Sequence, residues 1–202
     1  MPTANHQVPA DESSKLATPA PVTAWSRIAG RIRVPLGFLF AAFYIWRARP
    51  SWTSVAIGIA IAAVGIAIRA LAAGHVKKNR ELTTTGPYAY VRNPLYLGSI
   101  IIAVGFALSA RDIWIVVMLV VFFVVVYLPV IRGEQNYLRG HFDGYDEYTR
   151  RVPCLVPRTL WFAGATREFS RELYFRHREY NSLLGAAAML AVLIAKLLWL
   201  QR

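Results

Sequence analysis

Cysteine is almost absent from this sequence, which contains only Cys154 among its 202 residues. One cysteine can form neither a disulfide nor a cysteine-based zinc site within a single chain, so both are excluded. The sequence also lacks a Gly-x-Gly-x-x-Gly turn after a predicted strand, the phosphate-binding fingerprint of dinucleotide-binding folds. A soluble protein of the Rossmann type is therefore excluded as well.

Acidic residues are also scarce, with 11 Asp and Glu against 23 Lys and Arg, which gives a formal net charge of +12. Such a balance could indicate a nucleic-acid partner, but the basic residues lie beside long apolar runs and form no separate basic domain. Hydrophobic residues make up 56% of the chain and gather in runs too long for a soluble core. We therefore expect a membrane protein without a nucleic-acid partner.

Three charge-free runs predict membrane-crossing helices, at residues 113–131, 94–110 and 52–68. At about 1.5 Å per residue, each covers most of a hydrocarbon core of roughly 30 Å. Two shorter runs, 34–46 and 183–195, could also cross the membrane if the flanking Arg and Lys side chains extend to its surface. The alternative for each is a re-entrant or interfacial helix. We expect an all-α polytopic protein with about five spans, at approximately 31–48, 52–73, 94–110, 113–131 and 182–200.

The basic residues divide unevenly between the two sides that five spans create. One side receives the N-terminal segment, the loop 75–93 and the stretch 132–178, whereas the loops on the other side hold only Arg47, Arg49 and Arg111, with the C-terminal Arg202 beyond the last span. Because cytoplasmic loops carry an excess of Lys and Arg, the N-terminus and both long loops are predicted to be cytoplasmic.

The first 27 residues mix Pro, Ala, Ser, Thr and charges without apolar periodicity. No apolar segment there precedes a small-residue cleavage site, so a signal peptide is not indicated. Residues 1–27 are predicted to be a disordered cytoplasmic tail, and residues 28–202 a single membrane domain.

The second span is rich in glycine and alanine, which predicts close packing against a neighbouring helix. Arg69 lies near its cytoplasmic end. We expect this side chain to extend to the membrane surface, with contact to a ligand as the alternative.

Two polar clusters are expected to meet at the cytoplasmic face. The third and fourth spans are joined by little more than Arg111 and Asp112, so they should form an antiparallel hairpin that returns Pro94 and Arg132 to one face. Pro94 suits the first turn of a helix, so Arg92 and Asn93 lie just before a helix N-terminus. Free backbone N–H groups at such a terminus favour the binding of an anion.

The second cluster follows the fourth span. Leu138, Phe142, Tyr145 and Tyr148 recur at roughly helical spacing, which predicts an amphipathic helix on the cytoplasmic surface. The proline-containing stretch 152–157 then ends it. Cys154, within this stretch, is expected to be a packing residue.

These clusters carry a family resemblance. Residues 85–98 read Thr-Gly-Pro-Tyr-Ala-Tyr-Val-Arg-Asn-Pro-Leu-Tyr-Leu-Gly, and Glu134 precedes an aromatic-rich segment that closes with Arg-Val-Pro at 151–153. Together they resemble the signatures of the isoprenylcysteine carboxyl methyltransferase and phospholipid N-methyltransferase superfamily. The resemblance covers roughly residues 75–158.

The resemblance implies a compact helical membrane protein with a cytoplasmic S-adenosylmethionine pocket and a lipidic or prenylated substrate that enters from the bilayer. It implies catalytic roles for Glu134 and Arg92, and no metal. The cofactor-binding residues implied by the match are Tyr88, Arg92, Asn93, Tyr96, Gly98, Glu134 and Tyr145. The chain departs from the family pattern in three ways: Asn93 stands where many members have histidine, Gln135 replaces a second acid, and Phe142 and Tyr145 are one residue closer than expected.

The chemistry of these side chains suits that cofactor. Arg92 can bind a carboxylate, Glu134 can accept from hydroxyls or an ammonium group, and tyrosine rings can attract a sulfonium ion. Methyl transfer is an in-line displacement, so catalysis would come mostly from positioning in a dry pocket. A carboxylate acceptor needs no base, whereas an amine acceptor does, and Glu134 is the candidate base.

Other interpretations remain open at this point. An NADPH-dependent sterol-type reductase has a similar Arg-His-Pro-x-Tyr region, and a non-enzymatic scaffold or small transporter would use the motifs as interfacial anchors. Glu134 could also pair with Arg92 or Arg132 only to neutralise its charge. The sequence does not choose between carboxyl O-methylation of an isoprenylcysteine-type acceptor and N-methylation of a phospholipid.

Overall fold

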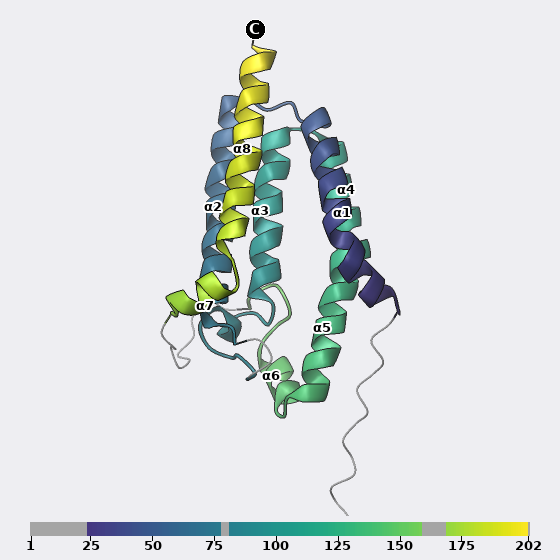
Figure 1. Cartoon of the computed structure of the whole chain (residues 1–202), viewed down its shortest axis with the longest axis vertical. Helices are drawn as coiled ribbons and strands as arrows, with labels where there is room; N and C mark the ends of the chain where they lie inside the picture. The colour runs from purple at the N-terminus through teal and green to yellow at the C-terminus, as the bar shows by residue number, and fades with distance from the viewer. Residues whose placement is uncertain (1–23, 78–80, 159–168, 202) are drawn as a thin grey trace, which may run out of the picture.

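The computed structural model describes residues 24–77, 81–158 and 169–201, and within these ranges it is all-helical (Figure 1). This confirms the predicted fold class. The predicted tail at 1–23 lies outside the described residues, while residues 24–27 form the start of the first helix. The elements are α1 (Ala24–Arg47), α2 (Trp52–His75), the 3-10 turn η1 (Gly86–Ala89), α3 (Pro94–Ala110), α4 (Ile113–Phe122), the π-helical turn η2 (Phe123–Tyr127), α5 (Leu128–His141), α6 (Tyr145–Arg151), α7 (Arg171–Arg176) and α8 (Tyr180–Leu200).

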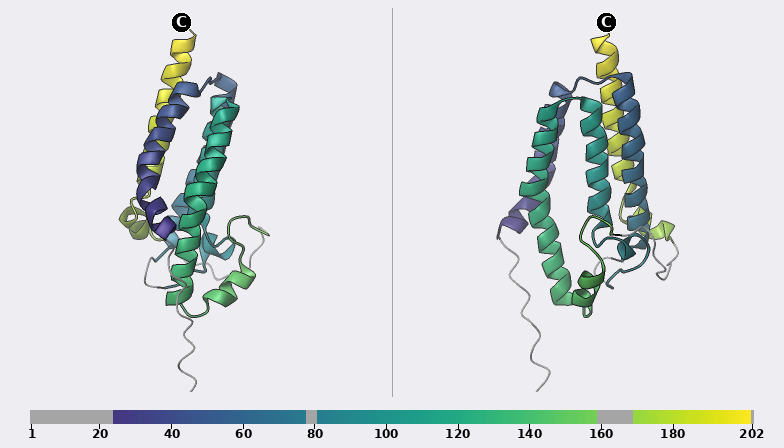
Figure 2. Two further views of the ribbon diagram at one scale, coloured as in Figure 1. Left: turned by 90° about the vertical axis from the view of Figure 1, so that its right-hand side faces the viewer. Right: turned by 180° about the vertical axis from the view of Figure 1, so that it is seen from behind.

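Three helical stretches are long and apolar enough to cross a membrane: α2, the continuous stretch Ile113–His141, and α8. The apolar parts of the other two long helices, Val34–Arg47 and Pro94–Ala110, are shorter. All five run lengthwise through the molecule (Figures 1 and 2). The protein is therefore a polytopic membrane protein by its helices, and the count of five spans remains a prediction.

Helices α2 and α3 pack with their backbones in direct contact. A Cβ atom added to Gly105 would lie 2.5 Å from the carbonyl oxygen of Gly58, and one added to Gly98 would lie 2.7 Å from that of Gly65. Both distances are too short for any residue but glycine. The close packing predicted from the small residues of the second span is thus confirmed, with α3 as the partner helix.

The helix that contains the fourth predicted span continues beyond residue 131. Helix α4, η2 and α5 form one uninterrupted helical rod from Ile113 to His141 (Figure 1). Pro129 stands in the first turn of α5, and the wider π-helical turn before it gives room to a residue that lacks an N–H and crowds the preceding turn.

The predicted amphipathic helix is consequently divided, and its description as one separate helix was wrong. Leu138 belongs to the end of the rod, Phe142 follows the last helical residue, and the chain turns through Gly144 at φ 79° before α6 begins at Tyr145. A sharp turn of this kind favours glycine. It folds α6 back toward the lower ends of the other helices (Figure 1).

The hairpin between α3 and α4 forms as predicted. Arg111 adopts a left-handed conformation at φ 53°, and Asp112 caps α4 by accepting from the Trp114 amide at 2.9 Å. Asp112 also forms an ion pair with Arg47 of α1 at 2.7 Å. The start of α3 and the end of α5 therefore lie toward the same end of the molecule, although the two helices diverge from their connection (Figure 2).

Candidate functional site

The first motif, which is residues 85–98, is held between α2 and α6. Gly86 has φ 58° and packs against the ring of His75, where a Cβ atom would lie 2.5 Å from His75 Cδ2. Tyr88 is 8% exposed, and its carbonyl oxygen accepts a hydrogen bond of 2.7 Å from the Tyr148 hydroxyl. These contacts hold the loop in one place immediately before α3.

The second motif runs from Glu134 to Pro153. It contacts the first motif through Pro153 and Cys154, which follow α6. The Arg92 amide donates to the Pro153 carbonyl at 2.9 Å, and the Asn93 amide donates to the Cys154 carbonyl at 3.2 Å. The Asn93 side chain also donates to that carbonyl at 3.2 Å and to Cys154 Sγ at 3.4 Å, while Gln135 Nε2 donates to Sγ at 3.0 Å. The two motifs therefore converge, and Cys154, expected to be only a packing residue, is hydrogen-bonded to Asn93, the residue before α3, and to Gln135 of α5.

Two buried polar atoms at this junction have no hydrogen-bond partner among the described residues. They are Arg92 Nε and the hydroxyl of Tyr145, a residue that is 2% exposed. Burial raises the pKa of the Tyr145 hydroxyl, and the positive charge of the adjacent Arg92 offsets part of that rise. The hydroxyl stays protonated at neutral pH and is available as a donor. Leaving such groups unsatisfied costs about 1–3 kcal/mol each, so a ligand with acceptor atoms would be stabilised here.

Glu134 lies exposed on α5. Its carboxylate forms no ion pair with Arg92 or Arg132 in the part of the chain that the structure describes. Burial raises the pKa of Tyr88, and the nearby Tyr148 and Glu134 add to this effect. The lack of an ion pair with either arginine among the described residues does not support the interpretation that Glu134 only neutralises an arginine.

Tyr96 and Gly98 extend the first motif along α3. The Tyr96 ring meets Tyr127 of η2 edge to face, with a centroid distance of 5.8 Å. Gly98 lies in the contact with α2, where a Cβ atom would be 2.5 Å from Arg69 Cγ. The structure therefore places Tyr96 toward the helical rod and Gly98 toward α2.

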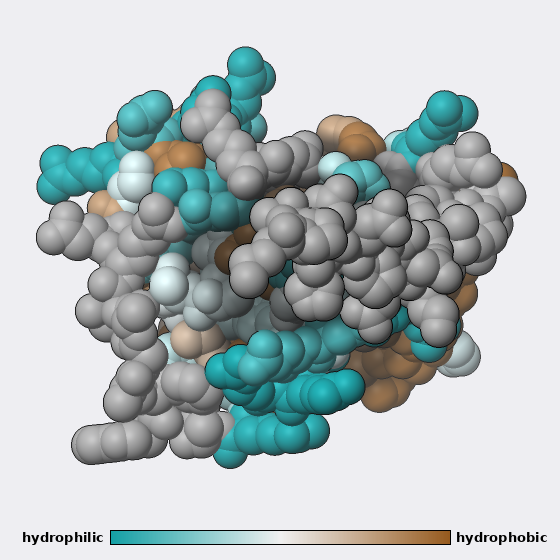
Figure 3. Space-filling model, turned by 90° about the horizontal axis from the view of Figure 1, so that it is seen from below, coloured by the Kyte–Doolittle hydropathy of each residue, from teal (hydrophilic) through white to brown (hydrophobic). Residues whose placement is uncertain are grey.

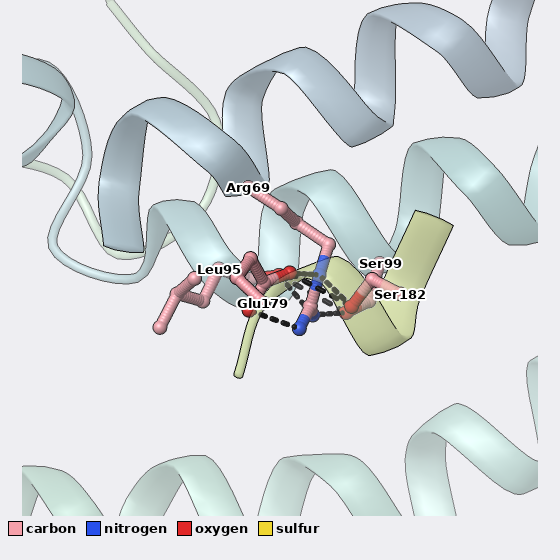
Figure 4. A network of polar contacts seen from close by, with 5 residues as sticks. All are labelled: Arg69, Leu95, Ser99, Glu179 and Ser182. Atoms are coloured by element: carbon pink, nitrogen blue, oxygen red, sulfur yellow. Dashed lines mark hydrogen bonds and ion pairs between the residues drawn. The ribbon is translucent and has the colours of Figure 1, made fainter. Parts of the chain in front are cut away.

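Sequence analysis missed a polar network around Arg69 (Figure 4). Arg69 Nε and Nη2 donate to the two carboxylate oxygens of Glu179 at 2.6 and 3.1 Å, and Nε also donates to the Ser182 hydroxyl at 3.1 Å. Its Nη1 donates to the Ser99 hydroxyl and, at 3.1 Å, to the Leu95 carbonyl.

The prediction that Arg69 extends to the membrane surface was therefore wrong. The guanidinium turns toward α3 and the start of α8, because Glu179 offers a bidentate partner there. Glu179 is 8% exposed. The signal in the sequence was an acidic residue immediately before the last apolar run, but nothing showed that it would meet the second span.

Buried donors of the two motifs and an exposed carboxylate on α5 are the groups here that could contact a ligand. Arg92 and Tyr145 supply unsatisfied donors, and Glu134 supplies an unpaired acceptor. Hydrophilic side chains gather at this end of the molecule (Figure 3). Among residues 24–77, 81–158 and 169–201, no group of three or more His, Cys, Asp or Glu side chains could hold a metal ion.

Residues 52–144 match the model of the family described as phospholipid methyltransferase. This segment contains the first motif, Glu134 and Gln135, so the family resemblance of the sequence is confirmed. No solved structure is significantly similar to the chain.

Three curated proteins are similar to parts of the chain. The nickel-cobalt-cadmium resistance protein NccN of Alcaligenes xylosoxydans xylosoxydans is 35% identical over 118 residues, which is 55% of each chain. The cobalt-zinc-cadmium resistance protein CzcN of Cupriavidus metallidurans is 30% identical over 140 residues, or 65% of this chain and 64% of that protein. The protein-S-isoprenylcysteine O-methyltransferase of Schizosaccharomyces pombe is 32% identical over 84 residues, or 40% of this chain and 36% of the enzyme. The chain thus spans between about half and two thirds of the length of the first two relatives.

Proposed function

We propose that this membrane protein, whose residues 52–144 match the phospholipid methyltransferase family, transfers a methyl group from S-adenosylmethionine to a lipidic acceptor. The observation that carries the proposal is the junction of the two motifs. Among the described residues, Arg92 Nε and the Tyr145 hydroxyl are buried there without a hydrogen-bond partner, and the exposed Glu134 precedes Gln135, which donates to Cys154. Buried polar groups are nearly always hydrogen-bonded, and a bound polar ligand would supply the missing partners here.

The residues of the junction fit the parts of this cofactor, which supplies an electrophilic methyl group on a sulfonium ion. Arg92 would bind the carboxylate, and Tyr145 would donate to the same group or to a ribose oxygen. Glu134 would accept from the ribose hydroxyls or the ammonium group. Tyr88 and Tyr96 would offer ring faces to the positive charge.

Asn93 has a supporting part in this proposal. Both its backbone and its side chain donate to Cys154, so it fixes the stretch after α6 against the start of α3. Gln135 donates to the same sulfur atom from α5. These neutral side chains would thereby shape the pocket without supplying the charge or the titrating imidazole of a histidine.

The acceptor is proposed to be an isoprenylcysteine-type carboxylate, with a phospholipid amine as the second candidate. A carboxylate is already ionised at neutral pH and demands only positioning. An amine must lose a proton, and Glu134 is exposed and unpaired, so it could accept that proton. The similarity to an isoprenylcysteine O-methyltransferase supports the first candidate.

Cofactor binding is the first test of this function. Calorimetry on the purified protein in detergent is expected to show binding of S-adenosylhomocysteine in preference to NADPH. Incubation with radiolabelled S-adenosylmethionine and total lipid extract, followed by mass spectrometry, should then identify the methylated acceptor. Binding of NADPH alone would favour the reductase, and binding of neither compound would favour a non-enzymatic protein.

The junction is proposed to face the cytoplasm, as the distribution of basic residues supports. Val156 is 75% exposed beside the junction, and Arg49 is exposed at the opposite end, between α1 and α2. In a Cys154→Ser background, Val156→Cys should resist a membrane-impermeant maleimide in intact cells until the membrane is permeabilised, whereas Arg49→Cys should react at once. The reverse pattern would invert the topology.

A further inference from the structure

Helix α7 lies at the boundary where two membrane helices end. It lies against the lower end of α2, on the outside of the bundle, and α8 begins at Tyr180 soon after it (Figures 1 and 2). Both α2 and α8 are long and apolar enough to cross a membrane. The Ser170 amide donates to the Gly74 carbonyl at 3.0 Å, and His177 Nδ1 lies 3.1 Å from the Ala73 carbonyl oxygen. These contacts hold α7 at the level where the two spans begin and end.

Arginine and aromatic side chains share the exposed face of this short helix. Arg171, Phe175 and Arg176 are exposed, whereas Leu173 and Tyr174 are half-buried. Because residues four apart lie on one side of a helix, Arg171 and Phe175 are neighbours on the outer face. The Phe175 side chain is 61% exposed. The outer face of α7 is therefore amphipathic.

The exposed rings form a small aromatic group beside the start of α8. The ring of Phe175 lies 6.4 Å from that of Tyr180, which is itself 37% exposed. Phe169, just before α7, is 42% exposed. Aromatic side chains are enriched where membrane helices meet the headgroup layer, because their rings pack there partly among lipid. The position of these rings next to a membrane helix indicates contact with lipid and not with bulk water.

The charge of this face is mainly positive. Three exposed arginines form no ion pair within the described residues: Arg171, Arg176 and Arg178. The exposed acid of α7 is Glu172, and the following Glu179 is neutralised by Arg69 at 2.6 Å. Three positive charges are thus opposed by one negative charge, which leaves guanidinium groups available to an external anion.

The end of α7 has an arginine at a position that favours glycine. The Arg178 amide donates to the Phe175 carbonyl at 3.0 Å, and the Glu179 amide donates to the Tyr174 carbonyl at 3.3 Å. These two bonds form a Schellman motif, in which the residue after the C-cap is left-handed. Arg178 accordingly has φ 51°. Since glycine adopts this conformation without strain, Arg178→Gly can remove the charge and keep the helix end.

We propose that the outer face of α7, together with Arg178, binds the phosphate groups of anionic phospholipids in the surrounding bilayer, while Phe175 and Tyr180 pack beneath the headgroups. A guanidinium group matches the geometry of a phosphate. A lipid with a net negative charge adds an attraction that a zwitterionic lipid lacks. An acidic soluble protein would suit the arginines but not the exposed rings beside a membrane helix. This binding does not depend on the methyl transfer proposed above.

The probe is a phosphatidylglycerol with a diazirine near its glycerol group, added in small amounts to the full-length protein in phosphatidylcholine nanodiscs. A phosphatidylcholine with the same diazirine is the matched probe. After irradiation, mass spectrometry should locate adducts of the anionic probe on Phe175 and Tyr180. One arginine near an anionic surface corresponds to roughly a fivefold preference, so these adducts should exceed those of the neutral probe at least fivefold. The preference should shrink in roughly 1 M salt.

Variants of the arginines test whether this face is the site. Arg171→Gln and Arg176→Gln should each lower the preference for the anionic probe up to about fivefold. Arg178→Gly should lower it similarly while the melting temperature stays equal or rises, because glycine relieves the strained backbone. Arg150→Gln is the control for charge, since Arg150 is exposed on α6, farther from α2 and α8 (Figure 1), and should behave like the wild type.

Thermal unfolding shows whether each variant is folded, and three separate positions keep the test valid if one fails. Equal labelling by the two probes would overturn the inference, and binding of soluble polyglutamate would then favour an acidic protein partner. A preference that persists in all three α7 variants would also overturn it. An equal loss in Arg150→Gln would attribute the preference to the net charge of the protein and not to α7.

Discussion

Replacing Arg92 by alanine is expected to weaken binding of S-adenosylhomocysteine by roughly ten- to hundredfold, the loss that corresponds to one charged hydrogen bond of about 1.5–3 kcal/mol. Thermal stability should change little. The side chain has a buried Nε without a partner among the described residues, and the contact to Pro153 comes from the backbone amide, which alanine retains. Calorimetry gives the affinity and thermal unfolding in detergent gives the stability.

Arg132→Ala is the matched control for this change. Arg132 is an exposed arginine on α5, one turn after that helix begins at Leu128, and its loss removes the same formal charge. Its affinity for S-adenosylhomocysteine should stay near that of the wild type. Equal losses in the two variants would attribute the effect to long-range electrostatics and not to contact with Arg92.

Variants of Glu134 distinguish contact with the cofactor from an ion pair between Glu134 and Arg92. Glu134→Gln should also weaken binding, and its effect on the melting temperature should add to that of Arg92→Ala, because the two side chains form no ion pair. A double variant more stable than the sum of the singles, with unchanged affinity, would make the pair structural and refute this site assignment.

The features that the sequence predicted well depend on local pattern or short connections. Long apolar runs identified the membrane helices, and the short link at Arg111 and Asp112 implied that the start of α3 and the end of the rod would face the same way. The glycines of the second span indicated a close helix contact but not the partner helix. Partner choice depends on shape complementarity between distant segments, which a residue pattern does not display.

The features that were missed depend on three-dimensional contacts. Arg69 and Glu179 are 110 positions apart, and only folding brings them together. The fourth span was predicted to end at residue 131, where the charge-free run ends, but the helix continues to His141, because helical backbone bonds can persist beyond an apolar segment. The family match implied that Asn93 binds the cofactor and that Gln135 stands in place of an acid, and it did not indicate that both would donate to Cys154.

Replacing Glu179 by alanine is expected to cost about 3–5 kcal/mol of stability, since it leaves the Arg69 guanidinium largely buried and without a counter-charge. The side chains of Arg69 and Glu179 are only 21% and 9% exposed, so solvent screens the charge weakly. Thermal or denaturant unfolding in detergent measures the loss. Adding Arg69→Met should recover much of it, because the double variant contains neither charge.

Glu147→Ala provides the contrasting case. Glu147 pairs with Arg151 on α6, but both side chains are more than two thirds exposed, so removing the pair should cost at most about 1 kcal/mol. If Glu179→Ala were as mild as Glu147→Ala, the Arg69 network would not hold α8 against α2 and α3. If Arg69→Met gave no recovery, Glu179 would stabilise the fold through Ser182 or its helix position and not through the charge of Arg69, since the bond to the Ser182 hydroxyl at 2.7 Å is independent of the arginine.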